Sequence, residues 1–149
     1  MLRTLCTTLA LTTAAAATAV LALGAPAGAA DDRLVLNAQL TGEQEAPAPG
    51  DPDGKAKGKL EVDVTTGRIC YSIEARKVDP LAAGHIHEKG LDSNTGPVVV
   101  SFTKTGPTTF GGCATNVAVA RGLQDEPGEY YLNVHNRSYP GGALRADLG

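Results

Sequence analysis

Large aromatic side chains are scarce in this chain of 149 residues, which has no tryptophan, two phenylalanines and four tyrosines. A core built on stacked aromatic rings is therefore excluded. Burial must depend on aliphatic side chains, which contribute about 25 cal/mol per Å² of apolar area. A domain of this size is only marginally stable on such burial, so a covalent cross-link would have a clear structural purpose.

Positive charge is also limited and is nowhere concentrated. Thirteen lysines and arginines stand against sixteen aspartates and glutamates. The segment KAKGK at residues 55–59 places its lysines at alternate positions, which is typical of the solvated face of a strand. The composition therefore gives no support for a nucleic-acid partner or an anionic membrane surface.

Motifs of nucleophilic and phosphate chemistry are missing as well. The sequence has no Gly-x-Ser-x-Gly elbow, no phosphate-cradling glycine loop and no zinc-finger spacing. The segment DPDG at residues 51–54 hints at a calcium loop, but Val62 stands where an EF-hand needs glutamate. A turn is the better interpretation of this segment. We assign no catalytic residue and expect a non-enzymatic protein.

The N-terminal residues have the features of an export signal. Arg3 lies in a short positive region, residues 9–23 are uncharged and mostly apolar, and the small residues GAPAGAA follow. This pattern predicts a secretory signal peptide at residues 1–30, cleaved after Ala29 or Ala30, and a secreted domain at residues 31–149. The apolar segment is shorter than the roughly 20 residues that a membrane anchor requires. We therefore expect no integral membrane segment in the mature chain.

The rest of the chain alternates between apolar and polar residues. A period of two residues is typical of half-buried antiparallel strands. The alternating or compact apolar segments are residues 33–40, 55–64, 68–75, 84–87, 97–102, 129–135 and 142–148. Seven or eight short strands in one domain predict an all-β fold, a Greek-key antiparallel β-sandwich.

Turn-rich segments separate these strands. We expect residues 43–54 and 103–112 to be loops, the first of them exposed. Residues 114–128 are ambiguous, since they fit either a strand near Val117 or a helical turn before Gly122. Arg145 alternates with the apolar Leu144 and Ala146, so its side chain is expected at the surface, with an ion pair as the alternative.

Cysteine usage agrees with export. Cys6 lies within the predicted signal peptide, which leaves Cys70 and Cys113 in the mature chain. Two cysteines in an exported protein usually pair. A Cys70–Cys113 disulfide would stabilise the fold by roughly 4 kcal/mol in the chain-entropy model. Two free thiols are the alternative.

Three segments in order resemble the CHRD domain, a module named after chordin and also found singly in exported bacterial proteins. They are LTGEQEAPAP at residues 40–49, AGHIHEKG followed by GPVVV at residues 83–100, and YYLNVHNRSYPGGALRADL at residues 130–148. The resemblance implies a β-sandwich-like exported domain with a binding or structural role. It implies no reaction, and the extracellular ligand stays unknown.

The histidines are the most distinctive polar residues. His85 and His87 share one face of a predicted strand, with Cα atoms about 6.6 Å apart, and His135 lies on another predicted strand. If these strands are neighbours, three imidazole nitrogens could approach to roughly 3–4 Å and ligate one ion at about 2.0–2.1 Å. Imidazole suits copper or zinc. The alternative function is thus a small metalloprotein, redox-active if the metal is copper.

A purely structural role for the histidines is the competing interpretation. His85 and His87 would then hold the loop at residues 88–97, and His135 would hold the segment at residues 137–142. Copper–zinc superoxide dismutase also carries a His-x-His strand and a later strand histidine on a β-sandwich. This chain lacks a further histidine for a bridging ligand, so dismutation is not implied.

Overall fold

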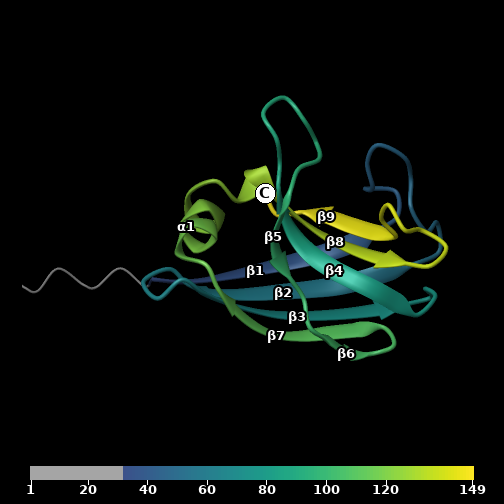
Figure 1. The fold of residues 1–149 in the computed structure, drawn as a ribbon, viewed down its shortest axis with the longest axis horizontal. Coiled ribbons are helices and arrows are strands. Elements are labelled where there is room, and N and C mark those ends of the chain that lie inside the picture. The colour runs from purple at the N-terminus through teal and green to yellow at the C-terminus, as the bar shows by residue number, and fades with distance from the viewer. Residues whose placement is uncertain (1–31) are drawn as a thin grey trace, which may run out of the picture.

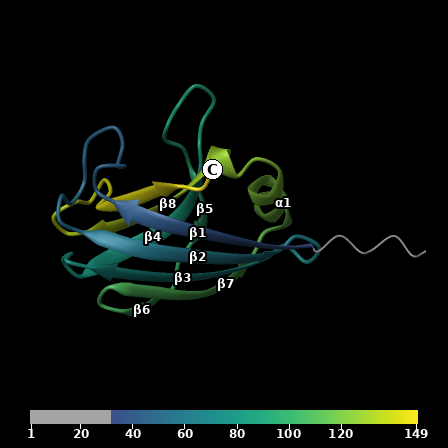
Figure 2. The same ribbon diagram turned by 180° about the vertical axis from the view of Figure 1, so that it is seen from behind.

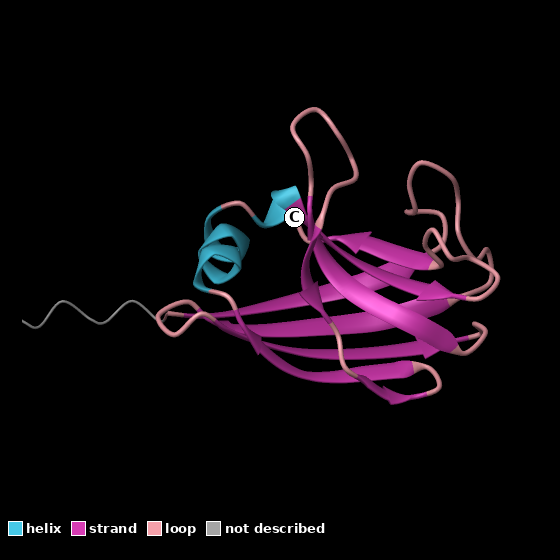
Figure 3. Ribbon diagram, in the orientation of Figure 1, coloured by secondary structure: helices cyan, strands magenta, loops and turns pink. Residues whose placement is uncertain are grey.

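A computed structural model describes residues 32–149 of the protein. The predicted signal peptide at residues 1–30, its cleavage site and Cys6 lie outside the described residues. The described part is mostly antiparallel strand with one α-helix (Figure 3).

Nine strands form one antiparallel sheet in the order β5-β4-β8-β9-β1-β2-β3-β7-β6. Their number exceeds the expected seven or eight because residues 103–112, expected to be a loop, contribute most of two further strands. The strands are β1 (Arg33–Thr41), β2 (Lys55–Asp63), β3 (Arg68–Arg76), β4 (Leu81–Glu88), β5 (Val98–Ser101), β6 (Lys104–Gly106), β7 (Thr109–Thr115), β8 (Tyr130–Asn136) and β9 (Leu144–Asp147).

The sheet curls so that its two halves face each other (Figures 1 and 2). Strands β5, β4, β8 and β9 form one layer, and β1, β2, β3, β7 and β6 form the other. The expected all-β, sandwich-like fold is confirmed. The layers approach closely where β2 has glycine, since a Cβ at Gly58 would lie only 2.7 Å from Leu132 of β8.

The two ends of the sheet are joined by continuous chain rather than left open. The Phe102 amide, just after β5, donates to the Gly84 carbonyl of β4. One residue later, the Thr103 carbonyl accepts from the Gly111 amide of β7. One extended segment therefore bonds to both layers. Unpaired strand edges promote association between chains, and this crossing limits the length of free edge.

The interior is aliphatic, as the composition predicted. Alternate residues of β2 and β3 are buried, among them Leu60, Ile69 and Ile73. Leu132 and Val134 of β8 complete the core from the opposite layer. The period-two pattern thus corresponds to real burial along these strands.

The ambiguous segment forms a helix. Helix α1 (Val117–Asp125) lies at one end of the curled sheet (Figure 1) and buries Val119, Ala120 and Leu123. The Asn116 side chain caps it by accepting a hydrogen bond from the Val119 amide. A short 3-10 helix, η1 (Pro127–Glu129), leads into β8. Within residues 32–149, no helix has the length and hydropathy needed to span a membrane.

The predicted disulfide is confirmed. Cys70 on β3 and Cys113 on β7 are direct cross-strand partners and are covalently bonded. The Arg68 side chain donates to both sulfur atoms, from Nε to Cys70 and from Nη2 to Cys113. The glycines of β7 give this strand few side chains to pack. The disulfide therefore provides a covalent attachment of β7 to the sheet.

Removal of the disulfide should measure its contribution. The variant Cys70→Ala/Cys113→Ala lacks a bond that spans 43 residues of sequence. We expect its free energy of unfolding to fall by roughly 3–4 kcal/mol in urea titrations. Arg68→Ala, which leaves the bond intact, is the control. A fall in the free energy of unfolding of less than about 1 kcal/mol would contradict the chain-entropy model, in which the bond acts by restricting the unfolded chain.

Candidate metal centre

The pairing of β4 with β8 brings the three histidines together on the outer face of their layer. His85 is the cross-strand partner of Asn133, and Ala83 is the partner of His135. His87 lies two pairs further along, opposite Tyr131 and on the same face. All three imidazoles are half-buried. The sequence-based expectation that these side chains share one surface is therefore met.

The ring nitrogens converge, though not tightly. His85 Nδ1 and His135 Nε2 are 3.2 Å apart. One nitrogen from each of the three residues lies within 4.8 Å of the others. This spread exceeds the roughly 3–4 Å expected for ligands around one ion. The rings would have to close in slightly for all three nitrogens to bind at about 2.0–2.1 Å.

Backbone carbonyls orient two of the rings. His87 Nδ1 lies 2.9 Å from the Gly96 carbonyl, and His135 Nδ1 lies 3.0 Å from the Pro140 carbonyl. A carbonyl only accepts, so each Nδ1 carries the hydrogen and each Nε2 keeps its lone pair. His87 and His135 therefore hold loops, as the structural interpretation predicts. The same bonds are those that commonly orient metal-ligating imidazoles.

All three imidazoles favour the neutral form. Burial, together with the neighbouring His135 and His87, lowers the pKa of His85 to about 4. Burial also lowers the pKa of His87 and of His135, and the carbonyl bonds offset this only in part. At neutral pH the rings are therefore uncharged, which is the form of imidazole that ligates a metal ion.

A stack of side chains supports His87 from the neighbouring strands. The Tyr131 ring is parallel to the His87 ring, with centroids 4.7 Å apart. The Tyr131 hydroxyl accepts a hydrogen bond from the Gly96 amide, next to the carbonyl that His87 contacts. The Arg145 guanidinium lies 3.7 Å from the centroid of the Tyr131 ring, a cation–π contact.

Arg145 is not at the surface, which corrects the sequence-based expectation. Its exposed fraction is 2%, and its Nε and Nη2 atoms donate to Asp147 Oδ1 at 3.0 and 2.8 Å. The ion pair that the sequence left as the alternative is present, at a buried arginine. Alternation placed Arg145 on the outer face correctly. That face is covered here because the loop at residues 42–54 packs against it, with the Asp51 amide donating to the Ala143 carbonyl.

The same loop contributes a buried carboxyl group that sequence reasoning missed. Glu45 was expected to be exposed, yet its exposed fraction is only 8%. Asn133 Nδ2 donates to both carboxyl oxygens of Glu45, at 2.7 and 2.8 Å. Burial raises the pKa of Glu45 to about 7, although the charge of Arg145 and the Asn133 hydrogen bond act to lower it. A lone glutamate in a turn-rich loop gives no sequence signal of such burial.

A shallow apolar depression opens beside the histidines. It is lined by Ala82, Ala83, His85, His135, Asn136, Arg137 and Pro140. His87 is not part of its wall, so His85 and His135 form the accessible side of the cluster. An exogenous molecule would approach a bound ion from this depression.

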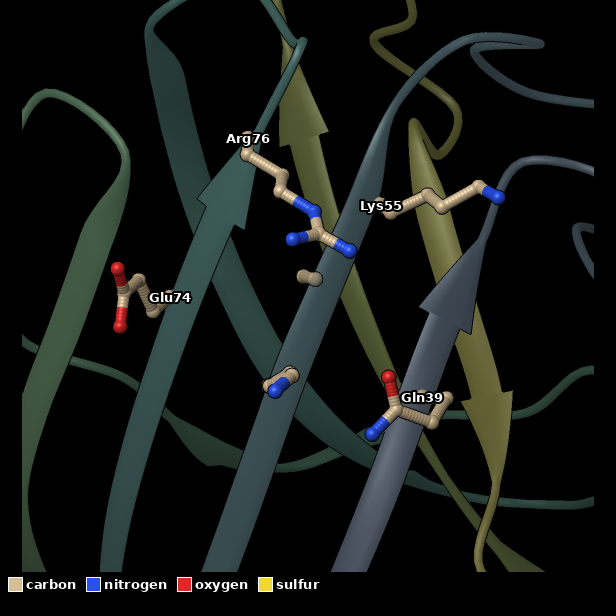
Figure 4. A pocket seen from close by; sticks show the side chains of 6 residues that line it. Gln39, Lys55, Glu74 and Arg76 are labelled. Atoms are coloured by element: carbon tan, nitrogen blue, oxygen red, sulfur yellow. The ribbon is translucent and has the colours of Figure 1, made fainter.

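Two further features, the DPDG segment and a hollow over the sheet, do not bring functional side chains together. Asp51 Oδ1 accepts from the Asp53 and Gly54 amides, so DPDG forms the expected turn. A second hollow lies over β1, β2 and β3, where the side chains of Gln39, Glu74 and Arg76 lie apart and do not converge (Figure 4). Neither feature builds a binding site.

The raised pKa of Glu45 predicts a pH-dependent stability. Below pH 4.5, the ordinary pKa of the group, folded and unfolded chains both carry the proton; between pH 4.5 and about 7 only the folded chain does. The free energy of unfolding therefore falls as pH rises through this window. Glu45→Gln removes the effect, so its stability relative to the unchanged protein should rise by up to about 3 kcal/mol across the window.

Urea titrations of the Glu45→Gln variant at several pH values between 4 and 8 test this expectation. Glu43→Gln, an exposed residue of the same loop, is the matched control. A stability difference between Glu45→Gln and the unchanged protein that stays constant with pH would contradict the assignment of a raised pKa.

Comparison with known proteins agrees with the motifs and the fold. The family model for the CHRD domain matches residues 36–148, nearly the whole described chain. Neither the curated proteins nor the solved structures contained a match. The matched range includes all three histidines, both disulfide cysteines and the buried Glu45. On this match, the chain belongs to the CHRD domain family.

Proposed function

We propose that the protein is an exported, non-enzymatic CHRD module that binds or organises an extracellular ligand. Membership of the CHRD family supports a binding or structural role. The cross-strand disulfide suits an oxidising compartment, and the N-terminal sequence has the pattern of a secretory signal. The observation that carries this proposal is the family match over residues 36–148. The identity of the ligand is not part of the proposal.

Export can be tested with the full 149-residue chain. Expressed in a secreting host, it should appear in the medium with a new N-terminus at Ala30 or Asp31, since small residues precede both positions. N-terminal sequencing and intact mass provide the measurement. Replacing Ala29 and Ala30 with arginine puts a charged residue immediately before both predicted cleavage positions and should block cleavage. Intracellular retention of the unchanged, uncleaved chain would contradict the proposal.

A second candidate function is a transition-metal centre at His85, His87 and His135. The observation that favours it is the convergence of three neutral imidazoles. The carbonyl-bound Nδ1 atoms of His87 and His135 leave each Nε2 as an acceptor, and His135 Nε2 accepts from His85 Nδ1. Copper or zinc fits an all-imidazole donor set. Copper would add redox chemistry at this position and zinc would not. The residues themselves bind and orient the ion, and the apolar depression admits a small exogenous ligand.

Metal content tests the second candidate. Protein purified from the full-length gene and dialysed against zinc or copper should retain about one ion per chain, measured by elemental analysis. His87→Ala should lose most of this metal, because Nε2 of His87 is one of the three donors. Glu88→Ala is the control, since Glu88 follows His87 but is exposed. Equal, negligible metal in the unchanged protein and in His87→Ala would exclude the centre.

A further inference from the structure

The outer face of β4 and β8 carries a fourth candidate donor beside the histidines. Asn133 lies directly opposite His85 and two residues before His135 on the same face of β8. Side chains at directly opposed positions have Cβ atoms about 4.5–5.5 Å apart. Asn133 therefore occupies the centre of the histidine cluster in the strand register, while His87 lies diagonally across from it.

Asn133 is buried and only half satisfied. Its exposed fraction is 3%. Nδ2 donates to both oxygens of Glu45, but Oδ1 has no hydrogen-bond partner among residues 32–149. A buried acceptor without a partner costs about 1–3 kcal/mol, so folded proteins rarely leave one. The Oδ1 atom therefore calls for a donor or a cation.

A second unsatisfied acceptor lies on the same face. His87 Nε2 is buried and also lacks a partner in the described part of the chain. Its Nδ1 carries the hydrogen that the Gly96 carbonyl accepts, so Nε2 is an acceptor. Two acceptors cannot satisfy one another. A single cation ligated by both atoms would satisfy them at once.

Glu45 fixes which end of the Asn133 amide is free. Both oxygens of Glu45 accept from Nδ2. While Glu45 is ionised, exchanging the nitrogen and oxygen of the amide would place Oδ1 against a carboxylate that cannot donate a hydrogen bond. The Glu45 carboxyl group also lies close to the backbone of Gly142, where a Cβ would be 2.4 Å from Oε2. The orientation of Asn133 is thus set from the loop at residues 42–54.

Arg145 is the competing partner for Oδ1. It lies opposite Asn133 on β9, and its Nη1 atom is a buried donor without a partner in residues 32–149. However, Asp147 and the Tyr131 ring hold the guanidinium in place, and no Asn133–Arg145 bond is formed. A water molecule bridging the two residues is the rival explanation that an experiment must exclude.

We propose that Asn133 supplies the fourth donor of the metal centre through Oδ1, and that Glu45 is the positioning residue that orients its amide. This inference rests on the proposed centre at His85, His87 and His135. It extends the donor set to three imidazole nitrogens and one amide oxygen. Such a set is uncharged and takes a divalent zinc or copper ion.

Zinc affinity and a cobalt spectrum test the assignment on protein made from the full-length chain. Asn133→Ala should bind zinc about 10- to 100-fold more weakly than the unchanged protein, a loss at least as large as that caused by removing a group that only supports a ligand. The visible absorption of the Co²⁺ form should shift, because the metal loses an oxygen ligand. A role limited to structure would leave that spectrum unchanged.

A swap variant, which exchanges the donor and acceptor of the Glu45–Asn133 hydrogen bond, separates loss of a metal ligand from misfolding. In the double variant Glu45→Gln/Asn133→Asp, the amide introduced at position 45 donates to the carboxylate introduced at position 133. The hydrogen bond is kept, and one carboxylate oxygen is left for the ion. This variant should bind zinc at least as tightly as the unchanged protein. Glu45→Ala, which removes the group that orients the Asn133 amide, should weaken zinc binding. Glu43→Gln, an exposed residue of the same loop, is the matched control, and its affinity should stay near that of the unchanged protein.

The outcomes separate this inference from the proposed centre. Zinc binding by the unchanged protein that persists in Asn133→Ala, with the same affinity and Co²⁺ spectrum, overturns the role of Asn133 and leaves the histidine centre intact. Weak binding with an unchanged Co²⁺ spectrum, not recovered by the swap, assigns Asn133 a structural role and also overturns it. No binding by the unchanged protein overturns both. If Asn133→Ala fails to fold, the swap variant alone decides: zinc binding weaker than that of the unchanged protein overturns the role of Asn133.

Discussion

The antiparallel pairing of β4 with β8 is the constraint on which the candidate site depends. These strands lie far apart in the sequence, at Leu81–Glu88 and Tyr130–Asn136, yet their register sets His85 opposite Asn133. A slip of one residue would turn these side chains into the aliphatic core. The hydrophobic face of each strand, including Ile86 and Leu132, therefore fixes the polar site on the other side. Site and core are two consequences of one alignment.

The outer face of the layer that contains β4, β8 and β9 is unusual, because loops bury it although its side chains are polar. Tyr131, Asn133 and Arg145 are all buried there, beneath loops that reach over from β1 and from β4. Their hydrogen-bond partners are Gly96, Glu45 and Asp147. Buried networks of this kind are costly if incomplete. The few atoms left unsatisfied therefore identify where a further binding partner would be accommodated.

The sequence predicted the parts of the molecule that follow from local pattern. Alternation located β1, β2, β3 and β8, and cysteine count with export predicted the Cys70–Cys113 bond. Strand β7 was missed because Gly111 and Gly112 interrupt the alternation of apolar and polar residues. Its pairing with β3 is also a long-range contact that no local pattern indicates. The helix was left open because its valines suit either structure. The histidine cluster could be proposed from spacing alone, whereas Glu45, Asn133 and Arg145 could not. Their burial depends on where a loop folds back, which no periodicity records.

The segment that crosses from β5 to β6 has a mechanical consequence. Because Phe102 bonds to one layer and Thr103 to the other, neither layer can peel away without breaking the pairing of this segment with the opposite one. The layers are also continuous at the other side through the pairing of Thr41 with Arg145. Because the two layers are hydrogen-bonded to each other at both sides, neither layer forms a subdomain that can unfold first. Unfolding of the chain should therefore be a single cooperative transition.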